Sequence, residues 1–161
     1  MMTKRLALMS LAGVLLFAAP ANAEQGPAGH NHDDSYPAGE PGNPKKPARN
    51  VRVTMGESGG KMLFAPARIE IRKGEQIRFM LRNNGELDHE FILATTADNL
   101  KHAAAMKKNP DMEHDDPNGK RLTPKKTDEI VWKFTKAGEF EYSCLIPGHR
   151  DAGMIGTVIV K

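Results

Sequence analysis

The sequence has little of three features that would point to particular classes of protein. Cys144 is its single cysteine, so no disulfide can form within the chain. Aromatic residues make up 6% of the chain, and its lysines and arginines are spread among acidic residues. A nucleic-acid-binding surface, in which basic groups gather with aromatic ones, is therefore not indicated. Beyond the N-terminal segment, no apolar run approaches the ~20 residues that a transmembrane helix needs.

The first 23 residues have the pattern of a secretory signal peptide. Lys4 and Arg5 form a positive start, residues 6–19 form an apolar centre, and Ala21-Asn22-Ala23 matches a small-residue cleavage site. Cleavage near Ala23 predicts an exported, periplasmic protein with no membrane insertion after the signal is removed. Because residues 1–23 hold two basic residues and no acidic ones, the formal charge then falls from +3 to +1.

The remaining 138 residues are enough for one domain with a single core. Residues 24–50 are rich in proline and glycine and poor in large apolar residues, which predicts a flexible tail. The tract His30-Asn31-His32-Asp33-Asp34 within it could bind a divalent metal weakly, but a solvated linker is the favoured interpretation because such tracts are not preorganised.

From residue 51 onward, apolar residues alternate with polar ones, which is typical of half-buried strands. Short segments of this kind are separated by turn sequences such as Asn83-Asn84-Gly85 and Ala137-Gly138. The pattern predicts an all-β fold, an antiparallel Greek-key β-sandwich over residues 51–161. The residues expected to face inward are Val51, Val53, Ile69, Ile71, Ile77, Phe79, Leu81, Ile130, Trp132, Phe134, Phe140, Tyr142 and Cys144, with a last strand at 155–160.

One short helix is expected to interrupt the strands. Thr95-Thr96-Ala97-Asp98 resembles an N-terminal cap, residues 99–107 are rich in helix formers, and Asn109-Pro110 is a stop signal. A long polar loop is predicted from residue 111 to about 126, before the last three strands.

The lone cysteine begins a run that contains three residues suited to binding copper. Cys144, His149 and Met154 follow one another at five-residue steps. A thiolate, imidazole and weak axial thioether, with a second histidine from elsewhere, form the site that holds one copper ion and cycles it between Cu(I) and Cu(II). An exported chain with an unpaired cysteine also needs a reason to keep a thiol, and metal binding is one. The alternative is a buried cysteine that packs as a small hydrophobe.

Strand alternation selects His89 as the second histidine. In the segment 87–93, His89 shares one side of a strand with Phe91 and Leu93, while Glu90 points to the other. Cys144 shares its side with Phe140 and Tyr142, so both ligands are expected to point inward. A hydrogen-bonded core histidine is the alternative for His89. Zinc is the rival metal, although it prefers Cys/His sets without a thioether, so Met154 argues against it.

These residues resemble the cupredoxin family over residues 50–161. The shared features are a histidine on an early strand and a Cys-x4-His-x4-Met loop before the last strand. Within this family, the chain is most similar to the bacterial periplasmic copper-tolerance cupredoxins, the CopI-like group. Four segments carry this similarity: Glu40-Pro41-Gly42, His89-Glu90-Phe91, 112–118, and Cys144 to His149. The resemblance implies type 1 copper bound by His89, Cys144, His149 and Met154.

By that resemblance, the protein is expected to bind one redox-active copper ion in the periplasm and to contribute to copper tolerance. It is not expected to be an enzyme, although oxidation of Cu(I) as part of tolerance is left open. The alternative is a one-electron carrier between respiratory partners, and the long insertion after the helix argues against so simple a role. Met106, Met112 and His114 suggest a second copper site, because thioether and imidazole suit Cu(I). Core packing for Met106 and a solvated loop for the other two are the favoured interpretation.

Overall fold

The computed structural model describes residues 36–109 and 116–161 of the chain. Ten strands and one helix lie within these residues. In chain order they are β1 (Glu40–Pro41), β2 (Arg49–Ser58), β3 (Lys61–Ala65), β4 (Arg68–Ile71), β5 (Gln76–Asn83), β6 (His89–Ala94), α1 (Thr96–Met106), β7 (Gly119–Leu122), β8 (Thr127–Lys133), β9 (Gly138–Ser143) and β10 (Ile155–Val160).

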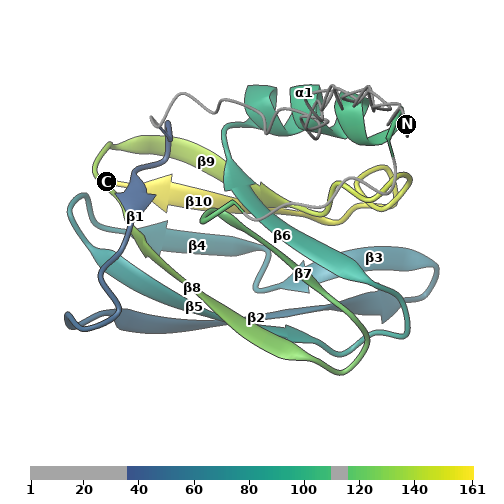
Figure 1. The fold of residues 1–161 in the computed structure, drawn as a ribbon, viewed down its shortest axis with the longest axis horizontal. Coiled ribbons are helices and arrows are strands. Elements are labelled where there is room, and N and C mark those ends of the chain that lie inside the picture. Colours follow the sequence, from purple (N-terminus) through teal and green to yellow (C-terminus); the bar gives the residue numbers. More distant parts are fainter. Residues whose placement is uncertain (1–35, 110–115) are drawn as a thin grey trace, which may run out of the picture. The chain divides into compact units, whose positions relative to one another are not determined.

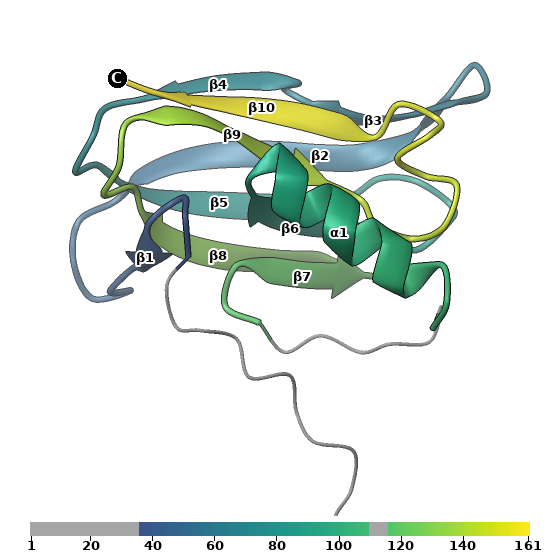
Figure 2. The same cartoon turned by 90° about the horizontal axis from the view of Figure 1, so that it is seen from above.

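The strands form two five-stranded sheets packed face to face (Figures 1 and 2). The first sheet has the order β1-β8-β5-β2-β3 and the second has the order β4-β10-β9-β6-β7. Most neighbours are antiparallel, but β2 pairs with β5 and β4 with β10 in parallel. The predicted all-β sandwich is confirmed, but the expectation that its strands are antiparallel is wrong for these two pairs.

The core lies between the two sheets. Because side chains alternate along a strand, every second residue of β2, β5, β8 and β9 points into this layer. Trp132, Phe79 and Phe91 are fully buried there. Burying one large apolar side chain contributes about 2 to 3 kcal/mol, so this layer is the main source of the fold's stability.

Helix α1 packs on the outer face of the second sheet, across β6 and β9 (Figure 2). The hydroxyl of Thr95 caps its first turn by accepting the backbone N–H of Asp98. Met106, from its last turn, packs with Ile92 and Leu145 in a small second cluster. The helix therefore covers a face that would otherwise meet water, and all six residues of β6 are buried.

Within residues 51–161, two strands were not expected from the sequence. The segment predicted as a polar loop at 111–126 contains β7, so four strands follow the helix rather than three. Strand β7 has a single apolar residue, Leu122, and among the described strands it pairs with β6 alone. Strand β3 follows the hairpin turn Gly59-Gly60. In both strands, backbone pairing rather than apolar alternation determines the conformation.

The predicted tail boundary at residue 50 is wrong for residues 36–50. Strand β1 pairs with β8, and β2 already begins at Arg49. Tyr36 packs edge-on against Trp132, whose indole N–H donates to the carbonyl of the buried Ala38. This segment joins the domain because it covers a tryptophan at the edge of the first sheet. The expected signal peptide and the His30–Asp34 tract lie outside the described residues.

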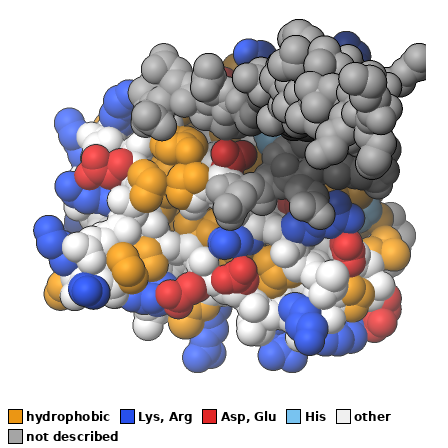
Figure 3. All heavy atoms as spheres, viewed as in Figure 1, with side chains coloured by type: hydrophobic (Ala, Val, Ile, Leu, Met, Phe, Trp, Pro, Cys, Tyr) orange, Lys and Arg blue, Asp and Glu red, His pale blue; other side chains and the backbone are white. Residues whose placement is uncertain are grey.

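The surface carries charges of both signs. On the face seen in Figure 3, lysine and arginine side chains are interspersed with acidic and apolar ones. Within residues 36–109 and 116–161, no helix is long and apolar enough to span a lipid bilayer.

Candidate metal centre

Three predicted ligands from two separate parts of the chain meet at one end of the sandwich. His89 is the first residue of β6, Cys144 directly follows β9, and His149 lies in the loop between β9 and β10 (Figure 1). Their ligand atoms all lie within 4.8 Å of one another. Sγ of Cys144 is 3.4 Å from Nδ1 of His149, and the two imidazole rings are 5.2 Å apart, centre to centre.

The imidazole of His89 is buried with its two nitrogens in different surroundings. Nε2 lies 2.8 Å from Oε1 of Glu57, near the end of β2. Nδ1 is buried, and no atom of the described residues forms a hydrogen bond with it. A buried polar atom normally has a partner, so an unpartnered nitrogen among a thiol and a second imidazole has the surroundings of a metal ligand.

The thiol of Cys144 is held in an apolar place. Burial raises its pKa to about 12, although the N–H groups of Glu90 and Ile146 act in the opposite direction. The Glu90 N–H lies 3.3 Å from Sγ. A metal ion would supply the positive charge that keeps this sulfur deprotonated.

His149 reaches the molecular edge but is only 9% exposed. Burial, and then the neighbouring His89, lower the pKa of its imidazole. Its ring is therefore neutral at pH 7, the form in which a histidine binds a metal.

The loop from residue 145 to 154 closes on itself by backbone hydrogen bonds. The N–H of Met154 donates to the carbonyl of His149, and the N–H of Cys144 donates to the carbonyl of Met154. Gly148 and Gly153 have φ angles of +89° and +102°, a region that favours glycine. These two glycines therefore permit the tight path of the loop. Met154 is fully buried within the loop.

A buried ion pair fixes the same loop to the sheet and the helix. The guanidinium of Arg150 pairs with Glu141 of β9 and donates to the hydroxyl of Ser143. From α1, the side chains of Thr96 and Asn99 also donate to the Glu141 carboxylate. Sheet, helix and loop therefore meet at one carboxylate, which binds the residue that follows His149.

Residues of the predicted second copper site are only partly described. Met106 is buried in the cluster with Ile92 and Leu145, while Met112 and His114 lie outside the described residues. That site stays a prediction.

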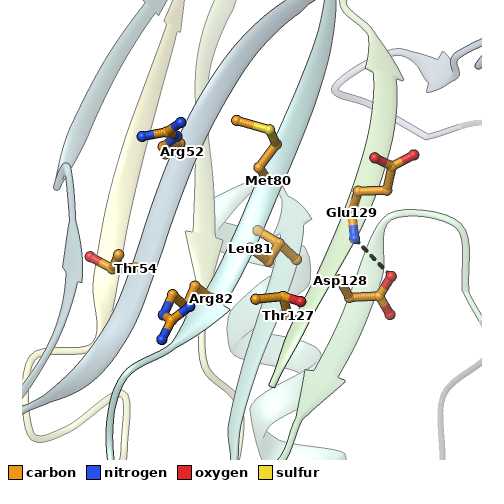
Figure 4. A pocket seen from close by; sticks show the side chains of 8 residues that line it. All are labelled: Arg52, Thr54, Met80, Leu81, Arg82, Thr127, Asp128 and Glu129. Carbon is orange, nitrogen blue, oxygen red and sulfur yellow. Dashed lines mark hydrogen bonds between the residues drawn. The ribbon is translucent and has the colours of Figure 1, made fainter. Parts of the chain in front are cut away.

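An open groove crosses the outer face of β2, β5 and β8 (Figure 4). Arg52, Met80 and Glu129 line it, and none of its lining residues is a histidine or cysteine. The groove therefore lacks the imidazole and thiol donors of the centre described above.

Sequence reasoning missed Glu57 and the Arg150–Glu141 pair. A signal for Glu57 was present: Val53 and Met55 point inward along β2, and Glu57 continues that alternation. An acidic residue at an inward-facing position near a strand end indicates a buried partner. Arg150 gave no such signal, since charged residues in loops are common.

The donor set fits copper. Imidazoles and a thiol that can be deprotonated, held in a mainly apolar place, match the ligands that copper selects. His89, Cys144 and His149 supply three such donors within reach of one ion.

Comparison with known proteins supports this fit. The family described as copper-binding proteins of the plastocyanin/azurin type matches residues 51–161. The chain is 46% identical over 153 residues to the copper-resistant cuproprotein CopI of Rubrivivax gelatinosus, covering 91% of each chain. It is 33% identical over 176 residues to the protein of the same name from Pseudomonas aeruginosa, again covering 91% of each.

The fold is also similar to that of a solved structure. Auracyanin B aligns with a TM-score of 0.61 at 23% identity, over 77% of this chain and 96% of that one. Sequence match, fold and donor set agree. The chain belongs to the plastocyanin/azurin family of copper-binding proteins, is related to the CopI copper-resistance proteins, and has one copper ion as its cofactor.

Proposed function

We propose that His89, Cys144, His149 and Met154 bind the copper ion as a type 1 centre. The convergence of two imidazoles and one thiol within 4.8 Å carries this proposal. Met154 is included because it closes the same loop, is fully buried and offers the weak thioether that such centres use as axial ligand. Bound in this way, copper supplies a one-electron Cu(I)/Cu(II) couple.

The protein's part in this chemistry is to hold the donors still. His89 and Cys144 are fixed by neighbouring strands, and His149 is fixed by a loop that is hydrogen-bonded at both ends. Donors that keep their places in both oxidation states reduce the rearrangement that accompanies electron gain or loss. The apolar surroundings exclude water from the sulfur.

We infer that the protein works in the periplasm and contributes to copper tolerance by binding copper there. Support comes from the similarity to relatives named copper-resistant cuproproteins, which extends over 91% of the chain. The signal-peptide pattern of residues 1–23 supports export. Binding alone would lower free periplasmic copper, and a redox-active centre would also allow Cu(I) oxidation if a partner accepts the electron.

A dedicated electron carrier is the second candidate. The observation that favours it is the position of His149 at the molecular edge, 9% exposed, next to the exposed Pro147 and Gly148. An electron could pass through this ring to a small, transient docking partner, such as a periplasmic redox protein.

Two experiments test these proposals. Absorption and electron paramagnetic resonance spectra of the copper-loaded protein should show one Cu(II) with intense sulfur-to-copper charge transfer. The Cys144→Ser variant should lose that band, and a retained band would refute the ligand assignment.

For the function, a strain that lacks the protein should grow poorly only under copper stress and should be rescued by wild type but not by Cys144→Ser. A respiratory defect at ordinary copper would favour the carrier.

A further inference from the structure

The carboxylate of Glu57 contacts both the ring of His89 and the backbone that leads to it. Oε1 lies 2.8 Å from Nε2 of His89 and accepts the N–H of Leu87 at 3.1 Å. Oε2 accepts the N–H of Glu86, also at 3.1 Å. One side chain from β2 therefore fixes the turn before β6 and the first imidazole of the metal centre.

The turn leaves room for this carboxylate. A Cβ atom built at Gly85 would overlap both carboxylate oxygens of Glu57. Although burial raises the pKa of Glu57, the N–H groups of Glu86 and Leu87 and the ring of His89 outweigh it and lower the pKa overall. Because its pKa is lowered, the Glu57 carboxyl group is ionised at neutral pH. Its side chain is 26% exposed, so water partly screens the negative charge.

The contact also determines which nitrogen of His89 carries the proton. A carboxylate only accepts hydrogen bonds, so Nε2 must be the N–H donor. In a neutral ring, Nδ1 then keeps its lone pair. Nδ1 is the buried nitrogen without a partner, and His89 lies with Cys144 and His149 in one cluster.

We propose that Glu57 is a positioning residue of the copper centre: it holds His89 as the Nε2–H tautomer, with Nδ1 free for copper, and its negative charge favours Cu(II) over Cu(I). The proposal rests on the ligand set proposed above. A carboxylate behind a ligating imidazole makes that imidazole a stronger donor. The more highly charged Cu(II) gains more from this than Cu(I) does.

Two variants separate orientation from charge. In Glu57→Gln, the amide oxygen still accepts from Nε2–H, but the negative charge is lost. In Glu57→Ala, both are lost. Glu75→Gln is the matched control, because Glu75 also accepts a backbone N–H, that of Arg72, and pairs with a side chain, that of Arg49. Glu75 lies just before β5, whereas the turn that Glu57 contacts lies just after the other end of that strand.

The first readout is the tautomer of His89 in the metal-free protein, from nitrogen-15 NMR shifts of the ring. Wild type, Glu57→Gln and Glu75→Gln should show a protonated Nε2 and a bare Nδ1. Glu57→Ala should show a mixture of the two tautomers. The readout needs no copper and does not respond to a mere loss of stability.

The second readout is the affinity for each oxidation state together with the reduction potential. Loss of the partner of a metal-binding histidine typically weakens metal binding by roughly 10–100-fold. We expect Glu57→Gln to lose about tenfold more affinity for Cu(II) than for Cu(I), which raises the potential by about 59 mV for a one-electron couple. Glu57→Ala should raise it at least as much, and Glu75→Gln should leave it unchanged.

The proposal is overturned if folded Glu57→Ala keeps both the wild-type tautomer and the wild-type potential. Failure of the proposed ligand set looks different. In that case the wild-type protein itself would lack a copper signal dependent on Cys144, while the tautomer in the metal-free protein would still decide the role of Glu57.

Discussion

Arg150, which directly follows the predicted copper ligand His149, forms its ion pair with Glu141 beneath the first turn of α1. The two side chains are only 14% and 8% exposed, and Nη2 of Arg150 is 3.1 Å from Oε2 of Glu141. Removing one partner of a buried pair leaves the other charge uncompensated, which is strongly destabilising.

Arg150→Ala should therefore lower the free energy of unfolding of the metal-free protein by about 3 kcal/mol, measured by urea denaturation. The control is Lys133→Ala, which removes the half-exposed partner of Glu40 and should cost less than about 1 kcal/mol. Equal effects of the two changes would show that the buried pair contributes no more than a surface pair.

Copper binding should release one proton per ion at pH 7.5. Burial raises the pKa of the Cys144 thiol to about 12, so the free thiol is protonated, and it must lose its proton to bind the metal. The proton is a product of binding, so a higher pH favours the complex, and the apparent affinity should rise about tenfold per pH unit between pH 7 and 9.

Proton release can be followed with an indicator dye in weak buffer, and affinity with a competing chelator. Burial lowers the pKa of His149, so its ring contributes no proton in this range. Cys144→Ser should abolish both the release and the pH slope. A slope that survives in this variant would assign the proton to another group.

Removing residues 36–42 should destabilise the domain. A chain that begins at residue 43 loses β1, the ring of Tyr36 and the carbonyl of Ala38, all of which cover Trp132. We expect a loss of about 2 kcal/mol or more, because large apolar surfaces become exposed. Trp132 is the single tryptophan, so its fluorescence should shift to longer wavelength.

A chain that begins at residue 36 is the control and should match the longer chain in both stability and emission. If the chain that begins at residue 43 kept the emission of wild type, the segment would not be the cover of Trp132.

Gly156→Ala should destabilise the second sheet. A Cβ atom at this position of β10 would overlap the ring of Tyr142 on the neighbouring strand. Tyr142 is fully buried and stacks on Phe91, so it has little space to move. Overpacking of this kind costs about 1–3 kcal/mol, and urea denaturation of the metal-free protein should show a loss in that range.

Thr157→Ala, one residue along the same strand, removes atoms from a half-buried position and should cost less. The assignment of the effect to Tyr142 would fail if Gly156→Ala were as stable as wild type.

Much of the centre could be predicted because its signals are local. Cys144 and His149 are spaced within one short loop, and the side on which His89 points follows from strand alternation. The same alternation located most core strands. These properties depend on the nearest neighbours along the chain, which the sequence displays directly.

The parts that sequence reasoning missed depend on contacts between distant residues. Strand β7 is held by pairing with β6 rather than by its own apolar pattern. The segment from Tyr36 to Gly42 is ordered because it meets Trp132, more than 90 residues away. Glu57 acquires its role only through the packing of β2 beside the turn before β6. No local pattern contains such partners.

The complete burial of Cys144 has a consequence for the protein before it meets its metal. Oxidants attack a thiolate that they can reach, and this sulfur is both inaccessible and protonated at neutral pH. The empty protein is thereby protected from sulfenic acid formation and from cross-linking with other thiols. In oxidising surroundings, the metal-free protein therefore keeps a thiol that can still bind an ion.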